Sequence, residues 1–223
     1  MGDVRVLIAD GHSLFREAVR LALDGEGDLE VVAEASDGLQ AVEEARRVRP
    51  DVALLDAALP NCDGVRATRL IRDSLEDCRV VLVTDEEDQG TLFAAVLAGA
   101  SGYLTKGSPL AELIEATRRI QDGETVIPPR MLGGLLERLV QRRREQDDAL
   151  KRIARLTRRE RETLALLADG QDNDGIAQAL VISPQTARTH VQNVLAKLEV
   201  HSRLEAAALA RRDGILQELL ETR

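Results

Sequence analysis

Aromatic residues are scarce in this 223-residue chain: tryptophan is absent, and Phe15, Phe93 and Tyr103 are the whole aromatic complement. Hydrophobic residues nevertheless make up 44% of the sequence, which is normal for a protein that buries a core. That core must be built from leucine, valine, isoleucine and alanine. Such a composition suits parallel sheets covered by helices, and small helical bundles.

Cysteine is equally rare, with Cys62 and Cys78 alone. Two cysteines provide neither a disulfide framework nor a cysteine-based metal cluster, and we expect free thiols in a reducing cytosol. No apolar run approaches the roughly 20 residues that a membrane span needs, and the N-terminal residues resemble no secretory signal. The sequence therefore predicts a cytoplasmic protein that does not enter a membrane.

The net charge of −9 is distributed unevenly along the chain. Residues 1–128 hold 25 acidic and 13 basic side chains, whereas residues 151–223 hold 10 acidic and 12 basic ones. An evenly acidic protein would be repelled by nucleic acid. Here the C-terminal third has a net charge of +2 and can approach phosphates.

Short apolar runs alternate with amphipathic stretches through residues 1–122. Alternation of this kind predicts a five-stranded, doubly wound parallel sheet, a flavodoxin-like α/β fold, whose functional site lies at the carboxyl ends of the strands. The expected strands are Val4–Ala9, Leu29–Ala35, Val52–Asp56, Arg79–Thr84 and Gly102–Thr105.

Residues 123–154 form an expected linker that is largely helical. Pro128 and Pro129 end any preceding helix and can begin the next one, and residues 131–154 have helical spacing with few breakers. Leu132, Leu139 and Ile153 lie on a seven-residue register that polar residues interrupt. The helix could pair with a second copy or pack on its own chain, and the pattern is too short to decide.

Residues 155–215 predict a four-helix domain, followed by a tail over residues 216–223. Thr157 and Glu160 have the spacing of a capping box at the first helix. Ser183 and Pro184 have the residue types expected at the start of the third helix. The short connection between the second and third helices is typical of a helix-turn-helix.

Polar groups follow several of the expected strands. Asp10 and Asp56 come at the ends of strands that a doubly wound topology brings side by side, while Thr84 and Lys106 follow two further strands. Carboxylates can hold Mg²⁺, and an ammonium and a hydroxyl can contact phosphoryl oxygens. The pattern favours a phosphoryl-binding pocket, although strand-end Asp and Thr residues also cap helices.

Residues 4–121 resemble the response-regulator receiver family. The stretches that carry the resemblance are residues 7–17, 50–56, 60–64, 81–84 and 98–106. The resemblance implies Asp56 as phosphoacceptor, Asp10 as part of the acidic pocket, Thr84 and Tyr103 as a switch pair, and Lys106 as the ammonium that contacts the phosphate.

One position departs from that family. The resemblance implies a second acid directly after Asp10 as the direct metal ligand, and this chain has Gly11 there. The remaining ligands would be Asp56, the main-chain carbonyl of Ala58 and a more remote Asp10. Mg²⁺ requires near-ideal oxygen geometry, so we expect weak binding and weak or absent phosphorylation at Asp56. The alternative is an ordinary phosphorylation switch in which Asp10 and water compensate.

Residues 156–210 resemble the LuxR-type helix-turn-helix of NarL/FixJ regulators. The resemblance is carried by residues 156–162, 176–177, 186–191 and 195–198, together with Gly170, Leu180 and Ser183. It implies that Arg188, Thr189 and Gln192 read bases, in agreement with the base edges that arginine, threonine and glutamine recognise. Thr186, Asn193 and Lys197 are expected to contact phosphates or to support the fold.

These features together predict a non-enzymatic transcription regulator of two-component type. Double-stranded DNA is the expected target, the chain is expected to be a homodimer on DNA with contact around residues 203–211, and a sensor histidine kinase is a candidate partner. A dinucleotide-binding enzyme would need a glycine-rich turn after the first strand, where Gly11 stands alone. An adaptor that acts by protein contact, with a vestigial helix-turn-helix, is the remaining alternative.

Overall fold

The computed structural model describes residues 3–211. The chain divides into two compact units, Met1–Leu139 and Val140–Arg223, which are described here one at a time. The predicted combination of an α/β unit and a helical unit is confirmed. The expected tail over residues 216–223 lies outside the described part, as do residues 212–215 at the end of the expected four-helix domain.

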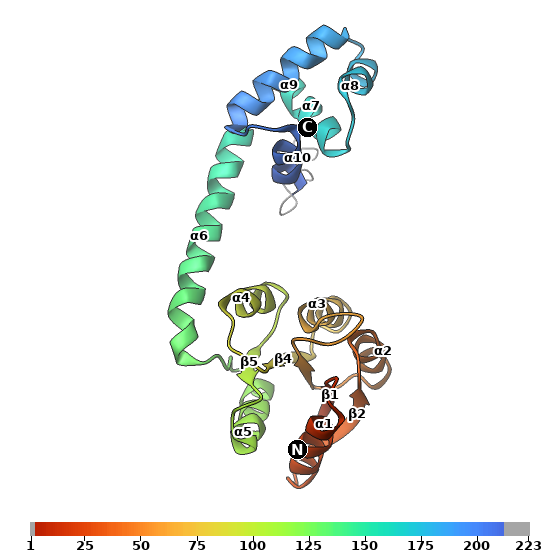
Figure 1. Cartoon of the computed structure of the whole chain (residues 1–223), viewed down its shortest axis with the longest axis vertical. Helices are drawn as coiled ribbons and strands as arrows, with labels where there is room; N and C mark the ends of the chain where they lie inside the picture. The colour runs from red at the N-terminus through yellow and green to blue at the C-terminus, as the bar shows by residue number, and fades with distance from the viewer. Residues whose placement is uncertain (1–2, 212–223) are drawn as a thin grey trace. The chain divides into compact units, whose positions relative to one another are not determined.

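The first unit contains one parallel sheet with the order β2-β1-β3-β4-β5 (Figure 1). Its strands lie where the apolar runs predict them: β1 Val4–Ala9, β2 Leu29–Ala35, β3 Val52–Asp56, β4 Arg79–Thr84 and β5 Gly102–Thr105. The order places β1 beside β3, so the residues that end these two strands become neighbours. This order is the doubly wound arrangement with its switch point between β1 and β3.

Helices cover both faces of this sheet. They are α1 Ser13–Asp24, α2 Gly38–Val48, α3 Gly64–Ser74, α4 Gln89–Leu97 and α5 Leu110–Gln121. Alternate strand residues point to opposite faces, so Leu7 packs in one buried cluster with Ala41 of α2 and Leu92 of α4, whereas the next residue in β1, Ile8, packs in another with Leu113 of α5. Cys62 and Cys78 are free thiols buried in the first of these clusters.

The segment after α5 continues the edge of the sheet. Val126 forms a parallel bridge with Gly102, and its carbonyl accepts a hydrogen bond of 2.8 Å from the amide of Tyr103. From the sequence, only an end of the preceding helix before Pro128 and Pro129 is expected here. The bridge covers part of the edge of β5, which would otherwise present unpaired backbone groups.

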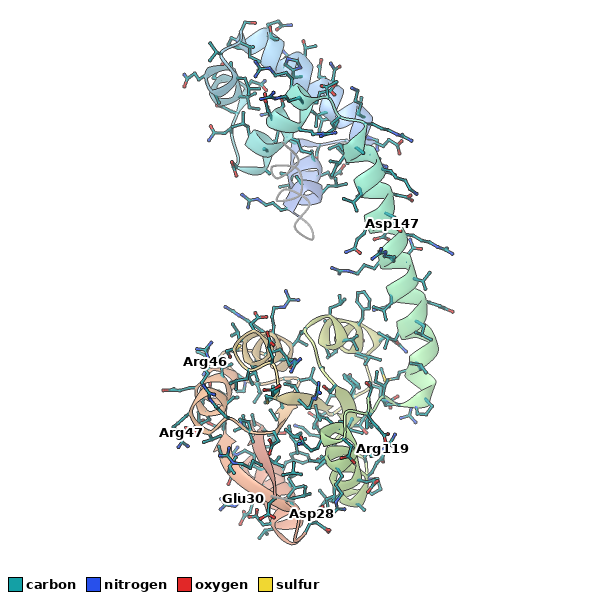
Figure 2. All side chains as sticks on the ribbon, turned by 180° about the vertical axis from the view of Figure 1, so that it is seen from behind. Asp28, Glu30, Arg46, Arg47, Arg119 and Asp147 are labelled. Carbon is teal, nitrogen blue, oxygen red and sulfur yellow. The ribbon has the colours of Figure 1, made fainter. Side chains whose placement is uncertain are left out.

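The linker helix α6, Pro129–Ala154, packs on its own chain at both ends. Met131 and Leu135 belong to a buried cluster of the first unit, and Ile153 belongs to that of the second. The middle of the helix is polar, with Asp147 projecting from it (Figure 2) and pairing with Arg143 one turn earlier. The packing of both ends favours the connector interpretation over the dimer helix.

The second unit is built from short helices after α6: α7 Arg158–Ala168, α8 Asn173–Leu180, α9 Pro184–Leu198 and α10 Arg203–Arg211. The predicted capping box is present, with the Thr157 side chain accepting from the Glu160 amide and the Glu160 carboxylate accepting from the Thr157 amide. Ser183 caps α9 as expected. Among the described residues, none of the helices combines the length and apolar character required to traverse a bilayer.

Candidate phosphoryl pocket and nucleic-acid interface

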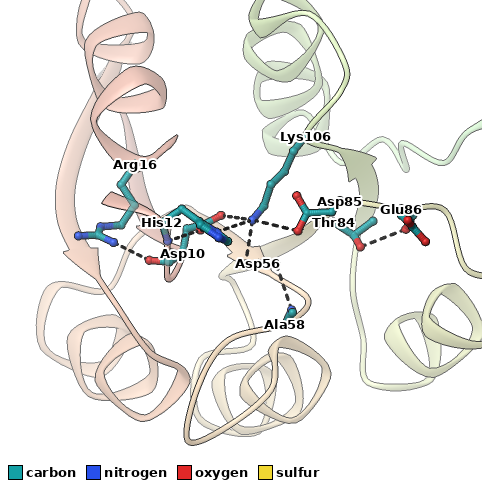
Figure 3. Close-up of polar contacts among 9 residues, drawn as sticks. All are labelled: Asp10, His12, Arg16, Asp56, Ala58, Thr84, Asp85, Glu86 and Lys106. Carbon is teal, nitrogen blue, oxygen red and sulfur yellow. Dashed lines mark hydrogen bonds and ion pairs between the residues drawn. The ribbon is translucent and has the colours of Figure 1, made fainter. Parts of the chain in front are cut away.

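The two predicted carboxylates meet beyond the carboxyl ends of β1 and β3. Asp56 is the last residue of β3 and Asp10 directly follows β1, and they are only 3% and 1% exposed. The Lys106 ammonium, supplied by the loop after β5, lies 2.8 Å from Asp10 Oδ2 and 3.0 Å from Asp56 Oδ2 (Figure 3). Three residues far apart in the sequence therefore form one buried cluster of charges.

Backbone and side-chain donors hold these carboxylates in place. The Ala58 amide donates to Asp56 Oδ1 at 3.0 Å, and the His12 amide donates to Asp10 Oδ1 at 2.7 Å. Arg16 donates from its guanidinium to the Asp10 carbonyl at 2.7 Å, which fixes the turn into α1. The carboxylates consequently face Lys106 in a defined orientation (Figure 3).

The pKa of Lys106 is raised above its ordinary value. Desolvation opposes the ammonium charge, but hydrogen bonds to Asp10 and Asp56 and their negative charges outweigh it. The ammonium also lies 5.2 Å from the centre of the Phe15 ring, which favours the cation. Lys106 is therefore a permanent cation in the pocket at neutral pH.

The pocket has donor atoms that suit a divalent cation. Ligand atoms of Asp10, His12 and Asp56 all lie within 4.8 Å of one another. Asp10 Oδ2 is buried, and its partner is the Lys106 ammonium at 2.8 Å. Asp10 and Asp56, with the main chain at Ala58, would hold Mg²⁺, which would screen the charge of an incoming phosphoryl group. His12, 72% exposed at its side chain, was not among the residues predicted from the sequence.

The predicted switch pair lies on neighbouring strands and faces the β4–α4 loop. Thr84 Oγ1 donates to the Glu86 carbonyl at 3.1 Å, and the Tyr103 hydroxyl lies 3.3 Å from the Asp88 amide, from which it accepts. Tyr103 is only 1% exposed, and burial raises its pKa. Both hydroxyls therefore contact the same loop, although neither contacts Asp56 directly.

The predicted recognition helix α9 presents its polar residues outward. Ala187, Val191 and Val194 are buried on one side of the helix. Five of the six predicted DNA contacts are exposed: Thr186, Arg188, Thr189, Gln192 and Asn193. Thr189, Gln192 and Asn193 point opposite the buried stripe by helical spacing, with Arg188 beside them.

The sixth residue, Lys197, has a partner inside the protein. Its ammonium lies 2.7 Å from a carboxylate oxygen of Glu160, which is 5% exposed. Desolvation tends to raise the pKa of Glu160, but hydrogen bonds from Lys197 and Thr157 outweigh it and hold the pKa below its ordinary value. Of the two expected roles of Lys197, this contact supports the structural one.

Comparison with known proteins identifies both units. Residues 6–118 match the response regulator receiver domain, and residues 154–210 match the bacterial regulatory proteins of the luxR family. The chain belongs to the response-regulator family. It is a two-component response regulator with a LuxR-type DNA-binding domain, and thus a transcriptional regulator.

Relatives of this response regulator match it over nearly their whole length. Transcriptional regulatory protein LiaR of Bacillus subtilis (strain 168) is 36% identical over 213 residues, which are 96% of this chain and 99% of LiaR. The probable transcriptional regulatory protein NarL of Mycobacterium tuberculosis is 38% identical over 213 residues, with 96% of each chain covered. The crystal structure of response regulator ChrA, of a heme-sensing two-component system, aligns with a TM-score of 0.52 at 31% identity, covering 98% of this response regulator and 100% of ChrA.

Membership of the family bears on the metal ion and on the binding partners of this response regulator. Receiver domains generally bind Mg²⁺ at an acidic pocket, and this response regulator has a cluster of Asp10, His12 and Asp56. A receiver domain implies a sensor kinase as partner, and a LuxR-type helix-turn-helix implies DNA. The homologues are transcriptional regulators and not enzymes.

Proposed function

We propose that this response regulator binds specific double-stranded DNA through α9. Arg188, Thr189 and Gln192 read base edges, and Thr186 and Asn193 contact phosphates. The observation that carries the proposal is the set of exposed polar residues along α9, opposite its buried stripe. Asp172 and Asp174, at the start of α8, lower the affinity because they repel nearby phosphates.

The regulator is a homodimer on DNA in this proposal. One short helix contacts too few base pairs for specific recognition, and a two-fold dimer solves this by reading two half-sites about one helical turn apart. The mutual contact lies at α10. Leu204 of α10 is 80% exposed, which supports a partner for this helix.

Asp56 is the phosphoacceptor, and its phosphorylation is weak because Gly11 replaces the acid that would ligate Mg²⁺ directly. The Lys106 ammonium, which lies 2.8 Å from Asp10 and 3.0 Å from Asp56, would contact the phosphoryl group. An ordinary phosphorylation switch is the first alternative. An adaptor with a vestigial DNA-binding domain is the second, and the outward polar face of α9 weighs against it.

We divide the chain into a receiver domain (residues 1–122), a linker (123–154), a DNA-binding domain (155–215) and a tail (216–223). The boundary between the two compact units falls within α6, between Leu139 and Val140, so this helix contributes residues to both units. Phosphoryl transfer to Asp56 is regulatory, so the protein is not an enzyme. Its site of action is the cytoplasm, where its DNA target and a sensor histidine kinase are accessible.

Selection of DNA fragments by the purified full-length chain, followed by titration with the selected sequence, tests this function. Arg188→Ala should lower specific affinity by about 1–3 kcal/mol and relax the preference at one base position. Arg158→Ala is the matched control, because Arg158 is an exposed arginine of the same unit on α7. An unchanged sequence preference in Arg188→Ala would contradict the assignment of α9, and one protomer per duplex in light scattering would contradict the dimer.

A further inference from the structure

The first three turns of α6, residues 129–139, pack on the receiver beside α4; we call this segment the clasp. Met131 and Leu135 are each 3% exposed, and Leu139 is partly buried against the same cluster. That cluster also contains Tyr103 and Leu92 of α4. The clasp therefore shares one buried core with the tyrosine of the switch pair.

Polar contacts join the clasp to the loop after β4. Arg130 forms a two-pronged ion pair with Glu87, and Gln89 donates to the Met131 carbonyl at 3.4 Å. The residues next to Glu87 in this loop, Glu86 and Asp88, contact the hydroxyls of Thr84 and Tyr103. A loop of four residues consequently contacts both switch hydroxyls on one side and the linker helix on the other.

A pair of glycines interrupts the clasp, where glycine is unfavourable in a helix. A Cβ atom at Gly134 would lie 3.0–3.1 Å from the side-chain end of Gln89, which is closer than ordinary contact, whereas a Cβ at Gly133 would meet nothing within 4 Å. Gln89 Oε1 is itself buried without a hydrogen-bond partner. A side chain at Gly134 would therefore have to displace the end of Gln89, which lies between α6 and α4, whereas a side chain at Gly133 would displace nothing.

We propose that the clasp is a detachable element of the receiver, and that its attachment to α4 and the β4–α4 loop keeps Tyr103 buried. Detachment is the event by which the receiver signals to α6, so the clasp and the acidic pocket are coupled through this loop. The coupling is reciprocal: whatever loosens the clasp frees Tyr103, and whatever moves the loop loosens the clasp. The inference concerns the regulation of the function proposed above and rests on it.

The chain is suited to a direct test because Tyr103 is its single tyrosine and tryptophan is absent, so intrinsic fluorescence reports this one side chain. Two full-length variants would be compared, Gly134→Gln and Gly133→Gln. Both replace a helix glycine by the same helix-favouring residue, and they differ in the contact with Gln89. The measurements are acrylamide quenching of Tyr103 and hydrogen exchange of the amides of residues 129–139.

In Gly134→Gln we expect exchange in the clasp to accelerate roughly tenfold or more and quenching to increase, because the new side chain separates α6 from α4. In Gly133→Gln exchange should slow or stay unchanged, and Tyr103 should remain protected. Equal behaviour of the two variants, or faster clasp exchange with Tyr103 still protected, would overturn the proposal. Loss of folding in Gly134→Gln is recognised by fast exchange in β1 and β3 as well.

A second pair of variants tests the loop contact without introducing bulk. Arg130→Gln removes the ion pair with Glu87, while Arg143→Gln removes the ion pair with Asp147 in the half of α6 beyond the clasp. The proposal expects increased quenching of Tyr103 in the first variant and no change in the second. Identical quenching in both would contradict it. These readouts involve no DNA, so failure to select DNA would reject the proposed function while leaving the clasp measurements interpretable.

Discussion

The polar groups of the acidic pocket are buried in the receiver, whereas those on the outward face of α9 are exposed to water. Asp10 and Asp56 are buried, and each has a fixed partner before any ligand arrives. Thr189 and Gln192 are exposed, and the Thr189 hydroxyl donates only to a carbonyl of its own helix. A buried polar group is expensive without its partner, whereas an exposed one has water. Substitutions in the pocket should therefore change stability, and substitutions of exposed α9 residues such as Thr189 and Gln192 should change binding alone.

The chain has three lysines, Lys106, Lys151 and Lys197, and their carboxylate partners differ in burial. Lys106 pairs with two buried carboxylates, Lys197 with one, and Lys151 with the exposed Asp148. If burial of the carboxylate decides the effect, the loss on replacement by methionine should fall in that order.

Lys106→Met should have the largest effect. Without a divalent cation, the free energy of unfolding of the first unit should fall by about 3 kcal/mol, because two buried carboxylates lose their common cation. Denaturant unfolding, followed by the fluorescence of Tyr103, measures the free energy of unfolding of this unit. Added Mg²⁺ should recover part of the lost stability. An unchanged unfolding midpoint without Mg²⁺ would show that Asp10 and Asp56 do not need the ammonium to offset their mutual repulsion.

Gly11→Asp should strengthen Mg²⁺ binding by roughly tenfold or more, because it adds an oxygen ligand beside Asp56. A Cβ atom at Gly11 would lie no closer than 3.7 Å to Pro60, so the side chain fits. Phosphorylation by acetyl phosphate should rise in parallel, as measured by phosphate-affinity electrophoresis. Gly27→Asp adds the same charge where a Cβ meets nothing within 4 Å, and it should change neither quantity. Fast Mg²⁺-dependent phosphorylation of the unaltered chain would instead restore the ordinary switch.

Lys197→Met should lower the free energy of unfolding of the second unit by about 1–2 kcal/mol. Glu160 has a lowered pKa, so its ionised form stabilises the fold above the pKa of the unfolded chain, and this stability is lost as the pH falls through the folded pKa. The difference in free energy of unfolding between the variant and the natural protein should therefore shrink in acid, because protonated Glu160 carries no charge for an ammonium to offset. Circular dichroism at several pH values measures it. Lys151→Met, at an exposed pair, should stay within about 0.5 kcal/mol.

Apart from the near-neutral Lys151→Met, Val181→Asn should give the smallest effect, a gain of about 1 kcal/mol in the second unit. Val181 ends α8 in the left-handed conformation, with φ of 56°, and is 90% exposed. A β-branched residue is unfavourable there and asparagine is tolerated, while little packing is lost. Thermal unfolding measures the gain, and an unchanged midpoint would mean that the turn relaxes around valine at no cost.

The sheet and the pocket could be predicted because they depend on local pattern and topology. Apolar runs locate β1 and β3, and parallel order then brings Asp10 and Asp56 together, whatever the details of packing. The recognition face of α9 could be predicted because its buried positions repeat with helical spacing.

Contacts between distant segments could not be predicted in this way. Nothing in the sequence near Val126 indicates its bridge to Gly102, which depends on where α5 ends. The pairing of Lys197 with Glu160 joins α9 to α7 across 37 positions, and a lysine on a recognition helix is equally compatible with phosphate binding. The role of Gly134 depends on the side chain of Gln89, which only the fold places beside it.

The burial of Cys62 and Cys78 has a practical consequence for thiol chemistry. They are the only cysteines of the chain, they are 3% and 2% exposed, and burial raises the pKa of Cys78 to about 12. At neutral pH the reactive thiolate of Cys78 is then scarce. A cysteine added at an exposed position, such as on the outer side of α6, would react with maleimide probes far faster than either natural thiol. The unaltered sequence is thus a ready background for placing paired labels on the two units.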